Sequence, residues 1–439
     1  MKTKLTFFEI LSVASMLFGL FFGAGNLIFP VLMGQMAGHQ VIAATAGFLV
    51  TGVGLPLLGV AALGIGKAEG LQDLSSRVSQ RFGLFFTCLL YLTIGPFFAI
   101  PRCASVSFTV GIEALVPQWD PRLSLAIFSI LFFAIVLFFS LRPGKILVWV
   151  GKLLNPLFLM VLFIFIVSAL LFPLGDIQSV QPEGSYVNAA VTTGLLEGYN
   201  TMDALAGLAF GIIVVQAIRS LGITEPVKIA QNTILSGSLS ALSMGLIYTL
   251  LALIGTLSRG AFPIANNGGE TLSWLAAYYF GPLGAILLAL MVTLACLKTA
   301  VGLITSCSET FRGMFSHGPS YKQYAIGFCL ISLLIANLGL DVILSWTTPV
   351  LMFLYPLAIV LIVLTLVERW LPSFRIVSRW TLGFAGVSAA LDFLVAMPAI
   401  GSFQFSDLLT WHSGFAWIIF ALIGFVIGYL QSVRSLKKE

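Results

Sequence analysis

The sequence has little charge and few of the residues on which enzyme chemistry depends. Charged residues make up 9% of the 439 positions and apolar residues 59%, whereas a soluble domain is typically about a quarter charged. The three histidines lie in loops or near the ends of apolar segments, and no Gly-x-Ser-x-Gly, His-Glu-x-x-His or Walker-type phosphate loop occurs. These absences argue against an intramembrane enzyme and an ATP-driven pump. The apolar excess predicts that lipid is the main solvent of the chain.

The cysteines and the net charge exclude further classes. Five cysteines, an odd number, stand in apolar surroundings without a Cys-x-x-Cys pair, so we expect neither a disulfide framework nor a zinc site, only small packing residues: Cys88, Cys103, Cys296, Cys307 and Cys329. A net charge of +5 would suggest an anionic partner for a soluble protein. In a membrane protein, the distribution of basic residues between the loops on the two sides of the membrane matters more than the net charge. We expect no nucleic-acid partner and no cofactor.

Twelve apolar segments are long enough to cross a bilayer, which takes about 20 residues. They predict an all-α polytopic membrane protein of one transporter domain, residues 1–439. The first run resembles a signal peptide, but it continues too far and has no clear cleavage site, so it is predicted to be the first span. The segments lie near residues 7–33, 40–66, 83–112, 123–141, 146–172, 191–217, 229–257, 282–308, 322–338, 341–367, 376–397 and 412–431.

The basic residues support this count and give an orientation. With twelve spans, eighteen of the 22 Lys and Arg residues fall on the side of the N-terminus, and the positive-inside rule makes that side cytoplasmic. Only Arg122 and Arg259 fall on the opposite side, and Arg102 and Lys298 lie inside spans. The eighteen are Lys2, Lys4, Lys67, Arg77, Arg81, Arg142, Lys145, Lys152, Arg219, Lys228, Arg312, Lys322, Arg369, Arg375, Arg379, Arg434, Lys437 and Lys438.

The connections are loop-sized, and the longest are residues 173–190 and 258–281. Within the second, the run from Asn266 to Tyr279 predicts an external amphipathic helix after a glycine turn. A lid over the site and an ordinary capping loop are equally consistent with this run. The segment 173–190 is predicted to be an extracellular loop.

Two spans carry glycine and polar residues at mid-membrane depth. The first contains Phe21-Phe-Gly-Ala-Gly-Asn-Leu-Ile-Phe-Pro30, and the sixth contains Glu197-Gly-Tyr-Asn-Thr-Met-Asp-Ala-Leu-Ala-Gly207. An unwound turn leaves backbone groups that lipid cannot satisfy. Interrupted helices at matching positions of two halves point to an inverted-repeat transporter with its site at the breaks. The alternative is that these glycines only allow continuous helices to pack closely.

Six motifs resemble one family. They are Gly23-Ala-Gly-Asn-Leu-Ile-Phe-Pro30, Thr51-Gly-Val-Gly-Leu-Pro56, Ile94-Gly-Pro-Phe-Phe-Ala-Ile-Pro-Arg102, Gly151-Lys-Leu-Leu-Asn-Pro156, Thr201-Met-Asp-Ala-Leu-Ala206 and Leu294 to Cys307. Together they resemble the bacterial branched-chain amino acid:cation symporters (LIVCS, carrier II proteins). The resemblance implies a LeuT-like fold. Its 5+5 inverted repeat would comprise residues 7–172 and 191–367, with two peripheral helices in 376–431.

The same resemblance implies the site residues. Backbone amides of Gly23, Ala24 and Gly25 would receive the substrate carboxylate, and Asn200, Thr201, Met202 and Asp203 would receive its ammonium group. Carbonyls near Phe21 and the Asn26 side chain resemble the ligands of a first Na⁺ site. Gly19, Phe22, Ala295, Lys298 and Thr299 fall on the second cation site. The spacing after Asn26 differs by one residue from the LeuT-like pattern.

Other charged residues in the spans leave alternatives open. Arg102 follows Pro96 and Pro101, which are expected to bend the third span, and it either contacts substrate or forms a structural ion pair with Asp203. Glu197 suits an external gate or a helix cap. Asp341 suits a helix end, and the sequence gives no account of Asp392.

Lys298 departs from the family pattern, because it stands where a hydroxyl ligand is usual. Its ammonium group could take the second cation position, donate to the carbonyls of Gly19, Phe22 and Ala295, and repel Na⁺. The group could also take up and release a proton during the cycle. The alternative is a lysine that extends along the helix away from the site.

The expected function is import of branched-chain amino acids, namely Leu, Ile and Val with Met plausible, across a bacterial inner membrane, coupled to Na⁺ or H⁺. An apolar pocket from spans one, three, six and eight is expected to select the side chain. Alternatives are a carrier for another small neutral amino acid, or an amino-acid-gated channel or sensor of the same fold. The sequence leaves the coupling ion, the substrate ranking and the oligomeric state open.

Overall fold

The computed structural model describes residues 5–116, 118–396 and 415–436. The helices of these residues are α1 (Phe7–Phe21), α2 (Ala24–Ala37), α3 (Val41–Leu49), α4 (Leu55–Ile65), α5 (Leu71–Ser76), α6 (Gln80–Leu92), α7 (Ala99–Val106), α8 (Pro121–Ser140), α9 (Asn155–Leu171), α10 (Tyr186–Asn200), α11 (Asp203–Ala209), α12 (Gly211–Ser220), α13 (Pro226–Ser258), α14 (Gly268–Phe280), α15 (Pro282–Met314), α16 (Tyr321–Ala336), α17 (Leu340–Leu366), α18 (Phe374–Ala396) and α19 (Trp417–Leu436).

The apolar segments predicted from the sequence coincide with helices wherever the structure describes them. By length and hydropathy alone, eight of these helical stretches suffice to cross a membrane, or nine if the bent pair α11 and α12 counts as one span. The difference from twelve has local causes. The break after α1 leaves that helix 15 residues long, and α16 has 16 residues. The twelfth predicted segment, whose start at residue 412 lies outside the described residues, is among the eight as Trp417–Ser435, whereas α18 is not.

Several spans deviate from regular α-helix. A π-helical stretch, Val50–Gly54, joins α3 to α4, and two others, Thr93–Phe97 and Ser107–Ile112, flank α7 in the third span. Gly95 has non-helical dihedrals (φ −90°, ψ −124°) directly before Pro96. The bend predicted at this proline is therefore confirmed, because a ring without an N–H interrupts the hydrogen-bond ladder there.

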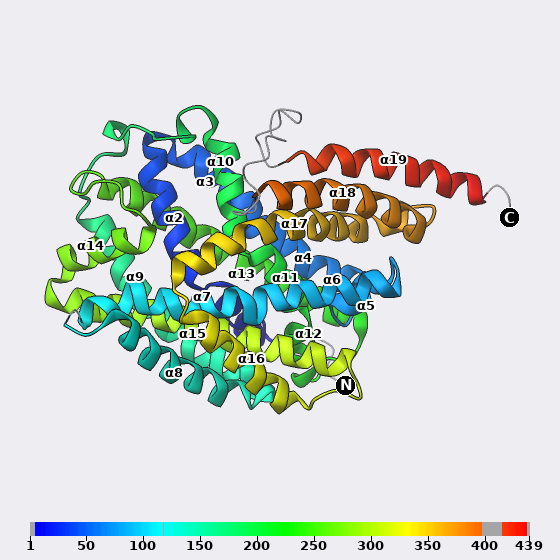
Figure 1. Cartoon of the computed structure of the whole chain (residues 1–439), viewed down its shortest axis with the longest axis horizontal. Helices are drawn as coiled ribbons and strands as arrows, with labels where there is room; N and C mark the ends of the chain where they lie inside the picture. The colour runs from blue at the N-terminus through cyan, green and yellow to red at the C-terminus, as the bar shows by residue number, and fades with distance from the viewer. Residues whose placement is uncertain (1–4, 117, 397–414, 437–439) are drawn as a thin grey trace.

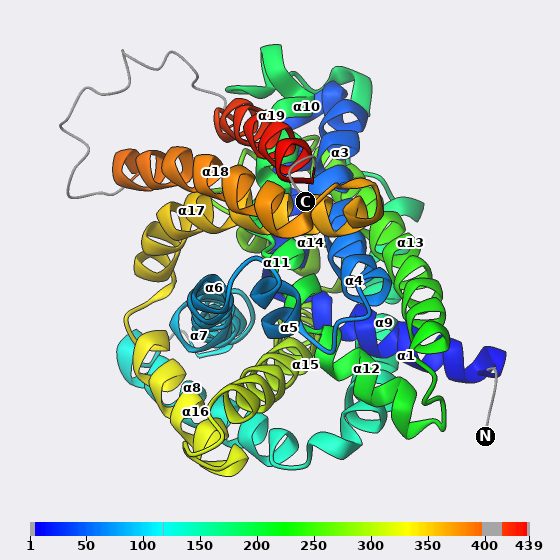
Figure 2. The ribbon, with the colours of Figure 1, turned by 90° about the vertical axis from the view of Figure 1, so that its right-hand side faces the viewer.

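The third span lies at the centre of the bundle, and the last two helices lie at its edge. Figure 2 looks along α6 and α7, which contact α15, α16, α8 and α17. α18 packs on α17, and α19 packs mainly on α18, at the periphery of the molecule (Figure 1). In Figure 1 the end of α19, α5 and α12 lie toward one side, and α14 lies toward the opposite side.

The amphipathic helix expected after residue 266 is present as α14. The Asn267 side chain accepts a hydrogen bond from the Glu270 amide at 3.0 Å and so caps the helix start. α14 packs on α2 and α15. The buried Gln35 of α2 accepts from Thr271 at 3.0 Å and from the Ala265 amide at 3.0 Å. These contacts fix α14 against the second half of the first span, α2.

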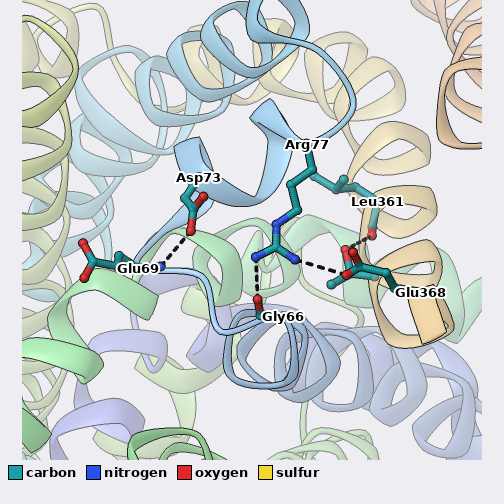
Figure 3. Close-up of polar contacts among 7 residues, drawn as sticks. Gly66, Glu69, Asp73, Arg77, Leu361 and Glu368 are labelled. Atoms are coloured by element: carbon teal, nitrogen blue, oxygen red, sulfur yellow. Dashed lines mark hydrogen bonds and ion pairs between the residues drawn. The ribbon is translucent and has the colours of Figure 1, made fainter. Parts of the chain in front are cut away.

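On the opposite side, Arg77 ties the short helix α5 to its neighbours. Its guanidinium donates to the Gly66 carbonyl at 2.5 Å and pairs with Glu368 at 3.1 Å (Figure 3). Gly66 follows α4, and Glu368 follows α17. α5 is thus anchored between the second and the tenth spans.

Candidate substrate and cation site

The first and sixth spans are interrupted at the positions that the glycine and polar residues predicted. α1 ends at Phe21 and α2 begins at Ala24, while α10 ends at Asn200 and α11 begins at Asp203. Met202 lies in the left-handed region (φ 65°), which a non-glycine residue adopts only at a cost. Side chains satisfy the free backbone groups, since Asn26 Oδ1 accepts from the Gly23 amide at 2.9 Å and Thr201 Oγ1 from the Asp203 amide at 3.3 Å.

The two breaks face one cavity, which is lined by residues of the first, third, sixth and eighth spans. Its lining includes most of the predicted substrate residues, namely Gly23, Ala24, Gly25, Arg102, Thr201, Met202 and Asp203. It also includes Phe21, Asn26 and Thr299 from the predicted cation sites. Its apolar lining comes from Leu20, Ile94, Ala99, Cys103, Ala206, Phe210 and Leu303. Asn200 lines a neighbouring cavity of about 540 Å³ beside Tyr199 and Tyr355.

The glycines of the first break bring bare backbone close to other groups. A Cβ atom at Gly25 would come within 3.0 Å of the Phe29 ring and 3.2 Å of Arg102 Nη2. A Cβ atom at Gly23 would come within 3.1 Å of Thr299 Oγ1. The glycines therefore allow the first turn of α2 to pack closely against these side chains at the cavity. The first amides of α2 carry the positive end of the helix dipole.

Arg102 binds the end of α10 instead of an acidic side chain. It is 4% exposed, its Nη1 donates to the Asn200 carbonyl at 3.0 Å, and its Nη2 donates to the Thr201 carbonyl at 3.4 Å. Among the described residues, no ion pair joins Arg102 to Asp203, and the guanidinium binds backbone carbonyls in place of this carboxylate. The freed carbonyls at the end of α10 are the closer acceptors for the guanidinium.

Asp203 and Asn26 connect the two breaks. Both are 2% exposed, and Asn26 Nδ2 donates to Asp203 Oδ2. The Tyr248 hydroxyl donates to the same carboxylate oxygen at 2.9 Å and accepts from Asn26 Nδ2. The Tyr248 ring packs against Phe22 and Phe48. These contacts bring oxygens of Asp203 and Tyr248 together with the Asn26 amide nitrogen beside the cavity. The role of Asn26 as a cation ligand stays a prediction.

The Lys298 side chain binds the C-terminal end of α1, where the first span breaks. It is 0% exposed, and its Nζ donates to the Phe22 carbonyl at 2.6 Å and to the Gly19 carbonyl at 3.3 Å. Ala295, the third acceptor expected, is not among its hydrogen-bond partners in the described structure. Thr299 Oγ1 also donates to Gly19, at 3.4 Å. The lysine does not extend away along the helix, so the alternative of a side chain that leaves the site is wrong.

Aromatic rings complete the surroundings of Lys298. Its Nζ lies 4.2 Å from the centre of the Phe158 ring, 5.4 Å from Phe22 and 5.5 Å from Phe18. Ring faces attract a cation, and two carbonyls accept from it. This environment offsets part of the cost of removing the charge from water.

Other acidic residues lie away from the cavity. Glu197 accepts from the Asn200 side chain at 3.1 Å, within α10. Asp341 lies in the first turn of α17, where a carboxylate favours the helix start, as predicted. Asp392 lies on the peripheral helix α18.

Sequence reasoning missed Tyr248 and Cys103. Tyr248 lies in the uninterrupted helix α13, without a glycine or a break to mark it. Cys103 was expected only to pack, yet it lines the cavity. Its position three residues before Val106 on the bent third span, directly after Arg102, was the available signal.

A cavity between the ends of two interrupted helices, inside a bundle of long apolar helices, defines a multi-span membrane carrier. Comparisons with known proteins agree. Residues 7–434 match the family described as branched-chain amino acid transport protein. The chain is 50% identical over 445 residues to the branched-chain amino acid permease BrnQ of Lactobacillus delbrueckii subsp. lactis, and 41% identical over 441 residues to BrnQ of Bacillus subtilis (strain 168), with all of each chain covered.

The chain therefore belongs to the branched-chain amino acid transport protein family, and it is a multi-pass membrane transporter with bacterial homologues, not an enzyme. Its fold is similar to that of Mhp1, a nucleobase-cation-symport-1 family transporter, in a closed conformation. The TM-score is 0.62 at 14% identity, over 98% of this chain and 92% of Mhp1. At this identity the likeness shows the fold alone, and it confirms the LeuT-like all-α architecture.

Proposed function

We propose that the chain imports branched-chain amino acids into a bacterial cell by alternating access, driven by a cation gradient. The observation that carries the proposal is the cavity between the two breaks, whose lining combines charged and polar groups with apolar side chains. The 50% identical relative is named a branched-chain amino acid permease. The excess of Lys and Arg on the N-terminal side supports an inner-membrane protein with both termini in the cytoplasm.

In this proposal the substrate carboxylate binds the first amides of α2, at Gly23 to Gly25, where the helix dipole favours an anion. The Gly23 amide then exchanges its bond to Asn26 Oδ1 for a bond to the carboxylate. The ammonium group binds the Asp203 carboxylate, and the carbonyls of Asn200 and Thr201 offer the lone pairs that Arg102 leaves free.

The aliphatic side chain then lies against the apolar lining, which includes Leu20, Ile94, Phe210 and Leu303. One methylene is worth only about 1–3 kcal/mol in such a pocket. Leu, Ile and Val are therefore expected to compete for the same site.

We propose further that Lys298 replaces the cation of the second site. Its bonds to the Gly19 and Phe22 carbonyls support this, because these are the backbone oxygens that the resemblance assigns to that cation. Coupling then runs through one Na⁺ beside Phe21, Asn26, Asp203 and Tyr248, or through a proton. The oxygens at this point suit a hard cation.

The test is uptake of labelled leucine into proteoliposomes under an imposed Na⁺ or H⁺ gradient, with isoleucine, valine, methionine and unrelated amino acids as competitors. We expect concentrative uptake, inhibition by the branched-chain competitors, and trans-stimulation by leucine on the far side. Uptake that follows neither gradient, or no preference for branched side chains, would contradict the proposal. Efflux without trans-stimulation would indicate a channel.

A further inference from the structure

The sixth span has a second interruption that the sequence did not indicate. α11 and α12 meet at Phe210 with a bend of 46°. Two buried hydroxyls from other spans bind the carbonyl of Ala209 at this bend, Tyr91 Oη at 2.8 Å and Ser306 Oγ at 2.6 Å. Side chains that insert at a helix carbonyl are a recognised cause of sharp kinks.

The bend places Phe210 against the substrate cavity. Phe210 lines the cavity, is fully buried, and packs edge-on against Phe21, the last residue of α1, with ring centroids 5.7 Å apart. Phe21 and Phe210 therefore meet where the first and sixth spans both turn away from the cavity toward the N-terminal side.

A second hollow lies just beyond this layer, and we refer to it as the vestibule. It has an empty volume of about 820 Å³ and lies between α5, α12 and the end of α15. Ile212 lines the vestibule, and Phe210, two residues earlier, lines the substrate cavity. Along α15, Leu303 lines the cavity and Thr310 the vestibule, with Ser306 between them. Phe210, Tyr91 and Ser306 thus form the layer between the two hollows.

The two walls of the vestibule are held differently. α5 is anchored by Arg77 to Gly66 and Glu368 (Figure 3). α12 has ten residues, and its side-chain ties are a bond from Gln216 to Glu309 of α15 and an ion pair between Arg219 and Glu69 at 2.8 Å. The Arg219 and Glu69 side chains are 46% and 74% exposed, and exposed pairs of this kind are weak.

We propose that Phe210 is the inner wall of the substrate cavity, that Tyr91 and Ser306 are positioning residues that hold it closed, and that α12 swings about the bend to release substrate into the vestibule. This proposal rests on the transport function proposed above. The movement separates α12 from α15 while α5 stays in place. Loss of a hydroxyl at the bend favours the inward-open state.

The first test cross-links α12 to α15. Gln216→Cys and Glu309→Cys are introduced together with Cys88→Ser and joined by a short bifunctional methanethiosulfonate. We expect the cross-link to stop labelled-leucine uptake and a reductant to restore it, while leucine binding to the purified protein persists. The control pair is Trp380→Cys with Gln431→Cys, side chains that also bond to each other, but between the peripheral helices α18 and α19.

Uptake through the cross-linked α12–α15 pair at the rate of the control pair would overturn the proposal. Uptake before cross-linking tests the transport function separately, because a carrier that never takes up leucine refutes that function and not the movement of α12.

A second test uses Tyr91→Phe, which removes one hydroxyl and keeps the ring. Loss of one hydrogen bond shifts the equilibrium between the outward-facing and inward-open states about five-fold. The apparent affinity for external leucine falls in proportion to the outward-facing fraction. We expect the KM for uptake to rise about five-fold while leucine binding in detergent, where both sides are accessible, stays unchanged. The matched control is Tyr279→Phe on α14, which removes a hydroxyl bond to the carbonyl of Phe172, directly after α9. An unchanged KM in Tyr91→Phe would overturn the positioning role of Tyr91.

Discussion

At each of the two interrupted spans, a buried basic side chain binds the carbonyls at the break. Lys298 of the eighth span binds the carbonyls of Gly19 and Phe22 where the first span breaks, and Arg102 of the third span binds the carbonyls of Asn200 and Thr201 where the sixth span breaks. A cation at the C-terminal end of a helix satisfies free carbonyls and complements the dipole. Each break is therefore stabilised by a side chain from another span.

The two cations differ in what else they reach. Lys298 lies outside the cavity lining, with three phenyl rings around it, whereas Arg102 lines the cavity and has one ring, Phe29, at 5.8 Å. We infer that Lys298 replaces an ion and acts on coupling, and that Arg102 shapes the substrate site. Because the two side chains lie at different positions, the coupling role of Lys298 and the substrate-site role of Arg102 can be altered by separate substitutions.

The largest effect is expected when the link between the breaks is removed. Asp203→Ala takes away the acceptor of both Asn26 and Tyr248, and bonds to a charged group are worth about 1.5–3 kcal/mol each. We expect leucine uptake to fall about a hundred-fold or more in Asp203→Ala and in Asn26→Ala, with membrane insertion retained. Asp392→Ala on α18 is the control and should transport normally. Unchanged affinity and cation dependence in both site variants would exclude this site.

Gly25→Val should weaken substrate binding strongly, because its Cβ atom already meets Phe29 at 3.0 Å and Arg102 at 3.2 Å, and the added methyl groups enter the carboxylate position. We expect saturable leucine binding to be lost in scintillation proximity measurements. The control is Gly245→Val in α13, where the nearest atom to a Cβ is 3.8 Å away. Wild-type affinity in Gly25→Val would remove the bare-backbone carboxylate site.

Arg102→Lys tests the cavity-facing cation. The charge remains, but a point-charge ammonium cannot reproduce the fork that bridges two successive carbonyls. We expect the KM for leucine to rise about ten-fold, from the loss of one charged hydrogen bond, with the Na⁺ and pH dependence unchanged. A changed cation dependence with the same KM would reverse the roles assigned to Arg102 and Lys298.

The smallest effect concerns Cys103, which lines the cavity beside Arg102. Bound leucine should slow its alkylation by a small maleimide several-fold without altering the protein. Labelled peptides measured by mass spectrometry report the rate, and Cys329 on α16, outside the cavity lining, serves as the internal reference. Equal rates with and without leucine would place the substrate elsewhere.

Much of the architecture was predictable, because spans and breaks have local causes. Apolar length defines the spans, and glycine with polar neighbours at residues 23–26 and 198–203 marks both breaks. The contact of Lys298 with the first break followed from the resemblance. The bend at Phe210, the partners of Arg102 and the role of Tyr248 did not, since each depends on a contact between distant spans: a hydroxyl at a carbonyl, a guanidinium at a helix end, a phenol at a carboxylate. Such contacts leave no periodic signal in the sequence.

The measurement that tests the central claim most directly is leucine uptake against Na⁺ concentration and pH in proteoliposomes containing wild type or Lys298→Thr. If Lys298 replaces the second cation, wild type shows a Na⁺ Hill coefficient of about one or below, and Lys298→Thr acquires a new Na⁺ requirement because the Gly19 and Phe22 carbonyls become free. A Hill coefficient near two in wild type, unchanged by the substitution and insensitive to pH, would contradict the account.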